Sequence, residues 1–397
     1  MHRKLILIFL LNILFLLITY GQVRIRLFSS QSPESVTFSV TGGAYEFDAF
    51  AGENLSIAKN ESVLITRYDG HLAIKTAKNK GFVCDSLILR GKTGSDFFSL
   101  RINGTQAIRQ FYTGDLQCFP DLGTILMINS CNVESYIAGV VEAEGGSGRS
   151  REYCKTQAIL ARTYMYRYFE RHLPDRYNVC DNTHCQAYSG LAGDSLISRA
   201  AIETRGLVVL DSARNLIISA FHSNCGGETC DPGDVWLTGM PYLKKRADPY
   251  CISSHNASWE KRISLKEWAS LMQRHGYQGK SDDPSNFAFQ QKTRQYYYRS
   301  GSFTIPLNSI RSDLNLRSTF FSVIPDGDSV ILKGRGYGHG VGLCQEGAMV
   351  MAAGGSSYRQ IIDFYYSGVT ITDIKNAVVP FSTQYGATAP KLPKGGL

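Results

Sequence analysis

The chain has 397 residues, of which 43% are hydrophobic, 11% aromatic and 19% charged. That length and composition allow one large or two modest domains with a hydrophobic core, and they exclude general disorder. The net charge of +8 is spread thinly along the chain and does not gather in a basic run, so we expect no nucleic-acid partner.

The first 22 residues predict export. A short basic start (His2, Arg3, Lys4) precedes the apolar run LILIFLLNILFLLITYG, which gives way to a polar stretch, as in a secretory signal peptide. An N-terminal membrane anchor is the alternative, because the run is long enough to span a bilayer and no A-x-A cleavage site stands out. In either case we expect the remainder in the periplasm or at the cell surface, with no second membrane-spanning run.

Ten cysteines agree with export, because an oxidising compartment permits disulfide bonds. Spacing does not determine how they pair. The simplest pairs are those closest in sequence, Cys180 with Cys185 and Cys225 with Cys230.

Residues 23–117 predict a β-rich region. Short runs such as VTFSV, SVLITRY and FFSLRI are separated by Gly, Asn, Asp or Ser. From about Cys131 the hydrophobic period becomes helical, and helices are expected over 132–146, 151–172 and about 195–206.

After residue 206 strands return, first over 207–224 and then in a hairpin over 320–336 around Pro325, Asp326 and Gly327. Between them, Ser264 and Glu267 match the S-x-x-E capping box of a helix.

The polar stretch 279–295 is interpreted as an insertion, and 376–397 as a loose tail. Helices that end in glycine are expected over 343–355 and 357–368. β structure on both sides of a helical block indicates an α+β fold.

The predicted helix 132–146 carries three glutamates. Glu144 falls on the apolar side marked by Ile137 and Val141, whereas Glu142 points nearly the opposite way. Glu134 lies in the first turn, where a negative charge suits the helix dipole.

Burial and the carbonyl groups of the last turn both disfavour the carboxylate of Glu144. Its pKa is therefore expected to be raised, as a general acid working near neutral pH requires. The alternative is a structural ion pair between Glu144 and a basic residue such as Arg162.

The segment GRGYGHGVG, residues 334–342, has glycine at every second position. An extended chain would have one face without side chains, which lets a ligand or another backbone come very close. The segment lacks the lysine and spacing of a phosphate loop, so a sugar ring is a reasonable ligand. The alternative is a tightly packed core strand in which His339 hydrogen-bonds internally.

Cysteine and histidine also lie close together in VCDNTHCQAY, which contains Cys180, His184 and Cys185, with His172 upstream. Both residue types are zinc ligands. The spacing is not that of a zinc finger, and export favours a disulfide, so we place metal binding second.

Together these segments resemble the SpoIID/LytB family, the stage II sporulation protein D and amidase-enhancer group of bacterial cell-wall proteins. The similarity rests on NVESYIAGVVEAE, KTQAILARTYMY, THCQAYSG, FHSNCGGET and GRGYGHGVGLCQEGA, which occur in the family's order. It implies one domain over 23–375, with a β-rich part over 23–117 and a catalytic core over 118–375.

The resemblance implies that Glu144 is the catalytic glutamate. SpoIID-type members are lytic transglycosylases that cut the MurNAc-GlcNAc bond of peptide-stripped peptidoglycan strands and leave a 1,6-anhydro end. LytB-type members stimulate an N-acetylmuramoyl-L-alanine amidase, so an enhancer with an amidase partner is the alternative function. A third interpretation is an exported scaffold.

A transglycosylase would also need residues that contact the glycan strand. Contacts with the glycan are expected from Arg162, Tyr188, Gly338, His339, Gly340 and Gln345. No cofactor is required, although some members bind zinc through a Cys/His cluster, which keeps Cys180, His184 and Cys185 as candidate ligands.

The sequence departs from the family's usual pattern in two places. Gly145 and Gly146 stand where members usually have Met-Pro, and Cys344 and Gln345 where they usually have Ser-Gln. The first departure is expected to loosen the end of the helix that carries Glu144.

Overall fold

The computed structural model describes residues 21–49, 54–78, 81–104, 109–236 and 238–378. The chain divides into two compact units, one of Met1–Arg149 with Gln157–Leu207, the other of Ser150–Thr156 with Val208–Leu397. This division differs from the single domain, split near residue 118, that the sequence suggests. The expected signal peptide or anchor and the expected tail from residue 379 lie outside the described residues.

The first unit is built on two sheets. Its strands are β1 (Gln22–Leu27), β2 (Ser35–Gly42), β3 (Ala44–Ala49), β4 (Asn54–Ala58), β5 (Ser62–Tyr68), β6 (His71–Thr76), β7 (Phe82–Cys84), β8 (Leu87–Gly91), β9 (Phe97–Ile102), β10 (Gln110–Thr113), β11 (Asp115–Asp121), β12 (Thr124–Asn132) and β13 (Val179–Cys180). One sheet has the order β13-β1-β12-β11-β8-β3-β4 and the other β10-β9-β2-β5-β6-β7.

The two sheets share a core of aromatic rings. Phe38 of β2 meets Tyr45 of β3 edge-on at 5.3 Å between ring centroids, and it stacks on Phe98 of β9 at 4.8 Å. All three side chains are fully buried. Alternation along the strands places such residues on the inner faces, as expected for a sandwich.

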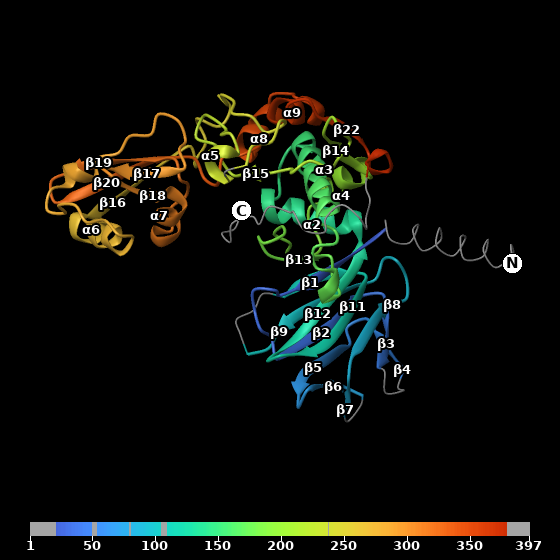
Figure 1. Ribbon diagram of the computed structural model, residues 1–397. Coiled ribbons are helices and arrows are strands. Elements are labelled where there is room, and N and C mark those ends of the chain that lie inside the picture. Colours follow the sequence, from blue (N-terminus) through green and yellow to red (C-terminus); the bar gives the residue numbers. More distant parts are fainter. Residues whose placement is uncertain (1–20, 50–53, 79–80, 105–108, 237, 379–397) are drawn as a thin grey trace, which may run out of the picture. The chain divides into compact units, whose positions relative to one another are not determined.

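Helices follow directly from β12 in this unit. They are α2 (Val133–Gly145), α3 (Arg151–Arg167), the short 3-10 helix η1 (Leu173–Asp175) and α4 (Ser195–Glu203), with the first residues of α3 assigned to the second unit. Figure 1 shows α2 and α4 at the end of the sheets where β12 finishes. The side chain of Asn132 caps α2 by accepting the N–H of Glu134 at 2.9 Å.

The second unit contains several small sheets. Its elements are β14 (Leu207–Leu210), β15 (Phe221–His222), α5 (Gly233–Trp236), β16 (Ser258–Ser264), α6 (Leu265–Arg274), η2 (Pro284–Phe287), β17 (Tyr297–Ser300), β18 (Phe303–Pro306), α7 (Leu307–Leu314), β19 (Phe321–Asp326), β20 (Ser329–Arg335), β21 (Leu343–Cys344), α8 (Gln345–Ala353), α9 (Tyr358–Tyr365), β22 (Thr370–Asp373) and η3 (Ile374–Asn376). The strands pair as β16-β20-β19, β14-β22, β15-β21 and β17-β18.

One core of the second unit is centred on Trp268 of α6, which is fully buried. Phe287 and Phe289 belong to this core. Both come from the polar stretch 279–295, so the segment interpreted as an insertion is part of the packing of this region.

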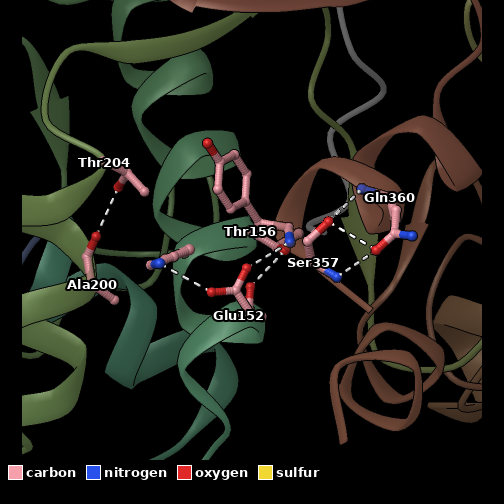
Figure 2. Close-up of polar contacts among 8 residues, drawn as sticks. Glu152, Thr156, Ala200, Thr204, Ser357 and Gln360 are labelled. Atoms are coloured by element: carbon pink, nitrogen blue, oxygen red, sulfur yellow. Dashed lines mark hydrogen bonds and ion pairs between the residues drawn. The ribbon is translucent and has the colours of Figure 1, made fainter. Parts of the chain in front are cut away.

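The capping of the helices agrees partly with expectation. Ser264 accepts the N–H of Glu267 at 3.2 Å, but the complete capping box is that of Ser357 and Gln360 at the start of α9 (Figure 2). Helix α9 ends at Tyr365, so Gly368 does not cap it.

The expected α+β class with a β-rich N-terminal half is confirmed. Strand β11 contains Pro120, which argues against a strand when only the sequence is considered. Among the described residues, no helix is long and apolar enough to cross a membrane.

Candidate functional site

Glu144 lies in the last turn of α2, and its side chain is half-buried. Its Oε1 accepts the backbone N–H of Ala187 at 2.8 Å. Burial raises the pKa of the Glu144 carboxyl, while the hydrogen bond from Ala187 opposes that rise. The direction agrees with the one expected from the helical face.

Glu134 and Arg162 form a buried ion pair, with 9% and 0% of their side chains exposed. Arg162 also donates to the carbonyl oxygens of Leu207 at 3.1 Å and Ala201 at 3.0 Å. The sequence suggested Glu144 as a partner of Arg162, whereas the ion pair in the structure is with Glu134. The glycan contact expected of Arg162 stays a prediction. Glu134 therefore belongs to a buried ion pair, in addition to placing a negative charge in the first turn of α2.

Glu142 fixes the loop before α4. Its carboxylate accepts the backbone N–H groups of Gly193 at 2.7 Å and Asp194 at 3.2 Å. Asp194 in turn caps α4 by accepting the N–H of Leu196 at 2.8 Å. Glu134 and Glu142 therefore hold the fold, whereas Glu144 has a carboxyl whose pKa is raised by burial.

Helix α2 continues through Gly145 despite the two glycines. Gly146 follows with φ 73°, and its N–H donates to the carbonyl of Glu142 at 2.9 Å. Arg149 Nε donates to the carbonyl of Gly145 at 2.8 Å. The end of the helix is thus anchored, contrary to the looser end expected from the missing Met-Pro.

Tyr188 packs inside the first unit in this structure, and its assignment to glycan binding stays a prediction. Its side chain is buried, and its ring lies 5.1 Å from that of Tyr136. A Cβ on Gly139 would come within 2.6 Å of the Tyr188 ring, so α2 approaches it very closely.

Four metal-ligating side chains converge in the first unit. We call His172, Cys180, His184 and Cys185 the Cys/His cluster; their ligand atoms all lie within 4.8 Å of one another. Cys185 Sγ is 3.4 Å from His172 Nε2 and 3.7 Å from His184 Nδ1. Hydrogen bonding, first from Cys185 and then from the histidines, lowers the pKa of the Cys180 thiol.

All ten cysteines are described, and none of them is in a disulfide. The expected pairs Cys180–Cys185 and Cys225–Cys230 are therefore corrected. Cys185 lies against histidine nitrogens, and Cys230 donates to the carbonyl of His339 at 3.3 Å.

The glycine run of the second unit is not an extended ladder. Strand β20 ends at Arg335, and Gly336, Gly338, Gly340 and Gly342 then have φ of 73°, 105°, 84° and 71°. This conformation favours glycine.

Another stretch of backbone lies against this run. Tyr337 and Asn224 exchange backbone hydrogen bonds of 2.8 and 3.0 Å, and a Cβ on Gly342 would lie 2.1 Å from the carbonyl oxygen of Ala220. The close neighbour of this run is therefore another stretch of the chain's own backbone. Sugar contacts at Gly338 and Gly340 stay a prediction.

His339 is hydrogen-bonded internally. Its Nε2 is 3.0 Å from the carbonyl of Phe221, and its Nδ1 accepts the N–H of Val341 at 3.0 Å. Burial, with smaller effects from Arg311 and Arg294, lowers the pKa of His339 to about 3. The ring is therefore neutral with both nitrogens engaged, as in the alternative of an internally hydrogen-bonded histidine. A glycan contact at His339 stays a prediction.

Gln345 begins α8 and is 7% exposed, and its assignment to glycan binding stays a prediction. Tyr337, within the glycine run, is 45% exposed. These residues belong to the second unit, whereas Glu144 and the Cys/His cluster belong to the first.

Sequence reasoning missed two features. The first is Ala187, whose backbone N–H leaves no signal in the sequence. The second is a buried set of Cys225, Asp248, Cys251 and Cys344. The sequence contains one indication of this buried set, because Cys344 and Gln345 stand where family members usually have Ser-Gln.

Comparisons with known proteins cover the region of Glu144. Residues 121–210 match the family model described as SpoIID, Stage II sporulation protein. An uncharacterised protein of Brachyspira hyodysenteriae is 25% identical over 88% of this chain and 93% of its own length.

Two Bacillus subtilis proteins are also similar. Stage II sporulation protein D is 28% identical over 62% of this chain and 76% of its own length. The amidase enhancer is 27% identical over 59% of this chain, and the match spans 40% of the enhancer. These findings confirm the resemblance drawn from the sequence.

Proposed function

Because this chain is a member of the SpoIID/LytB family, we propose that it is an exported peptidoglycan lytic transglycosylase with Glu144 as its general acid and base. Its substrate would be glycan strands stripped of their stem peptides. The observation that carries the proposal is the half-buried Glu144 carboxyl at the end of α2, whose pKa is raised by burial.

The chemistry needs one carboxyl group. Protonated Glu144 donates its proton to the oxygen between MurNAc and GlcNAc, and the bond from that oxygen to C1 of MurNAc breaks. The resulting carboxylate takes the proton of the MurNAc C6 hydroxyl, whose oxygen bonds to C1 and closes the 1,6-anhydro ring. No water is consumed and Glu144 ends protonated, unlike a two-carboxylate glycosidase.

Ala187 would keep the acid in place during both proton transfers. Its N–H holds Oε1 of Glu144 at 2.8 Å. A hydrogen bond to a carboxylate favours the ionised form, so this contact stabilises the state that accepts the C6 proton. Acid and base help of this kind is worth on the order of 100- to 10,000-fold in rate.

The Cys/His cluster fits a zinc ion. Two thiols and two imidazoles form a ligand set that zinc commonly takes in tetrahedral sites, and their atoms are already within 4.8 Å of one another. When bound, zinc would cross-link the segment 172–185. Because Ala187 follows Cys185 by two residues, the ligands would hold the backbone that positions Glu144.

Glu144→Gln tests the proposal, because glutamine keeps the shape and the Ala187 contact but cannot relay a proton. Purified protein is incubated with intact and with peptide-stripped peptidoglycan, and the products are identified by mass spectrometry. We expect anhydro-ended products from the parent on stripped strands and a loss of at least about 100-fold in Glu144→Gln. The matched control is Glu142→Gln on the same helix, which should retain the activity.

Equal product formation by the parent and Glu144→Gln would refute the assignment. A parent that forms no anhydro product would refute the transglycosylase. The second candidate function, suggested by the similarity to the amidase enhancer, then predicts binding to glycan without cleavage and stimulation of an added cell-wall amidase. A protein that neither cuts nor binds peptidoglycan would be a scaffold.

A further inference from the structure

A second set of metal-ligating side chains lies within the second unit. Cys225, Asp248, Cys251 and Cys344 are all buried, and one ligand atom from each lies within 4.8 Å of all the others. Cys225 Sγ is 3.3 Å from Cys251 Sγ and 3.3 Å from Asp248 Oδ2. We call these residues the Cys/Asp cluster.

Two backbone N–H groups point at the sulfur of Cys344. Cys344 is the N-cap of α8, and its Sγ accepts the N–H groups of Gly347 at 3.4 Å and Cys225 at 3.3 Å. The N-terminus of a helix attracts negative charge. Backbone N–H groups directed at sulfur are the outer contacts that orient a metal ligand and tune it.

Asp248 is a fully buried carboxyl whose hydrogen-bond partners carry no positive charge. They are the hydroxyl of Tyr365 at 2.8 Å, the backbone N–H of Tyr250 at 3.0 Å and the thiol of Cys225. Burying a charge without a counter-charge is costly. A divalent cation beside Asp248 would remove that cost.

Helix α8 passes beside the Cys/Asp cluster, and its residue at that point, Gly347, has no side chain that would collide with Asp248 or Tyr365. A Cβ on Gly347 would lie 2.6 Å from Asp248 Oδ2 and 2.3 Å from the Tyr365 hydroxyl. The position therefore allows α8 to approach the carboxylate and its tyrosine closely.

We propose that Cys225, Asp248, Cys251 and Cys344 bind a zinc ion in a closed, structural site. Three sulfur ligands favour zinc over magnesium or calcium, and four protein ligands fill a tetrahedral shell with no position open for substrate. The ion would join the chain after β15, the loop at 248–251 and the start of α8. Its role is to stabilise the second unit.

A disulfide is the rival use of these thiols. A bond between Cys225 and Cys251 would consume two of them, leaving Cys344 as an isolated thiol and Asp248 as a buried carboxyl with neutral partners. Zinc engages all four groups at once, which is why the geometry favours it.

The test uses the double variant Cys180→Ser/Cys185→Ser as its background. This background variant lacks the thiols of the Cys/His cluster and keeps the Cys/Asp cluster intact. Metal content is measured on the full chain by inductively coupled plasma mass spectrometry after purification without chelator. We expect this variant to keep about one zinc per chain. Adding Cys344→Ser should remove it.

Cys230→Ser is the matched control, because Cys230 is also buried in the second unit but lies outside the cluster. Added to the same background, it should leave the zinc content unchanged.

Cobalt replacement gives a second measurement that needs no change in the cluster. The background variant loaded with Co²⁺ should show strong thiolate-to-cobalt absorption. Absence of that absorption, a folded background variant free of metal, or a Cys225–Cys251 disulfide found by peptide mass mapping would each overturn the proposal. The outcome does not depend on whether Glu144 is catalytic, because no glycan is used.

Discussion

The backbone N–H of Ala187 holds the Glu144 carboxyl from a segment more than 40 positions along the chain. Its effect on the glutamate opposes that of burial: burial favours the neutral acid, and the hydrogen bond favours the anion. A residue that must be acid and then base in one reaction benefits from both influences.

The first prediction concerns the pH dependence of cleavage. Because the pKa of Glu144 is raised in the folded protein, its protonated form persists to higher pH than in an exposed glutamate. We expect kcat/KM on peptide-stripped glycan to fall as pH rises through that raised value. A half-point no higher than that of an ordinary glutamate would contradict the raised pKa.

The same shift has a consequence for stability. A carboxyl with a raised pKa destabilises the fold as pH rises through that value, because the folded state resists its ionisation. Glu144→Gln should therefore be more stable relative to the parent near neutral pH than in mild acid. Denaturant unfolding followed by circular dichroism at the two pH values measures the difference.

The second prediction concerns the buried pair of Glu134 and Arg162. Glu134→Gln leaves the guanidinium buried without its carboxylate, so the free energy of unfolding should fall by about 3 to 5 kcal/mol. Glu142→Gln, which changes a more exposed glutamate of the same helix, should cost less. If both variants lose the same free energy of unfolding, the Glu134–Arg162 ion pair stabilises the fold no more than the contacts of Glu142 with the loop before α4.

The third prediction separates two reasons for glycine in the second unit. Gly342 and Gly327 both have positive φ, but a Cβ on Gly342 would lie 2.1 Å from the Ala220 carbonyl, whereas one on Gly327 meets nothing within 4 Å. Gly327→Ala should cost about 1 to 2 kcal/mol of stability from backbone strain alone. Gly342→Ala should cost clearly more, because the two segments must also separate.

Tryptophan fluorescence can measure both glycine variants, since the three tryptophans lie in the second unit. If the two substitutions cost the same, close approach of the backbone is not what requires glycine at 342.

The fourth prediction concerns acid unfolding of the second unit. His339 and His222 are buried, and burial lowers the pKa of both. Their contribution to stability is present above the unfolded pKa of about 6.5 and is lost as pH falls toward the folded values, with a slope of up to about 1.4 kcal/mol per pH unit for each ring.

His339→Gln should make the loss of stability between neutral and acid pH less steep, as measured by tryptophan fluorescence in denaturant titrations. His255→Gln is the control, because His255 is exposed. An unchanged slope in His339→Gln would show that this histidine is not what makes the unit sensitive to acid.

Local patterns predicted much of the architecture. The β-rich start, the helix over 133–145 with its Asn132 cap and the hairpin of β19 and β20 are all present. The helix and the hairpin depend on interactions between residues near in sequence, and the strands of the β-rich start show a local alternation of residue types, which is why the sequence reveals them. Glu144 was singled out for the same reason, since helical period alone places it on the apolar side.

The sequence by itself therefore determined the β-rich start, the helical block that follows it and the exceptional glutamate. Only the tertiary structure decided what each polar group contacts: Glu134 pairs with Arg162, the glycines admit a neighbouring backbone, and cysteines distant in sequence gather beside Asp248. Such contacts join segments far apart in the chain. No local period or spacing encodes them, and they exist only once the chain has folded.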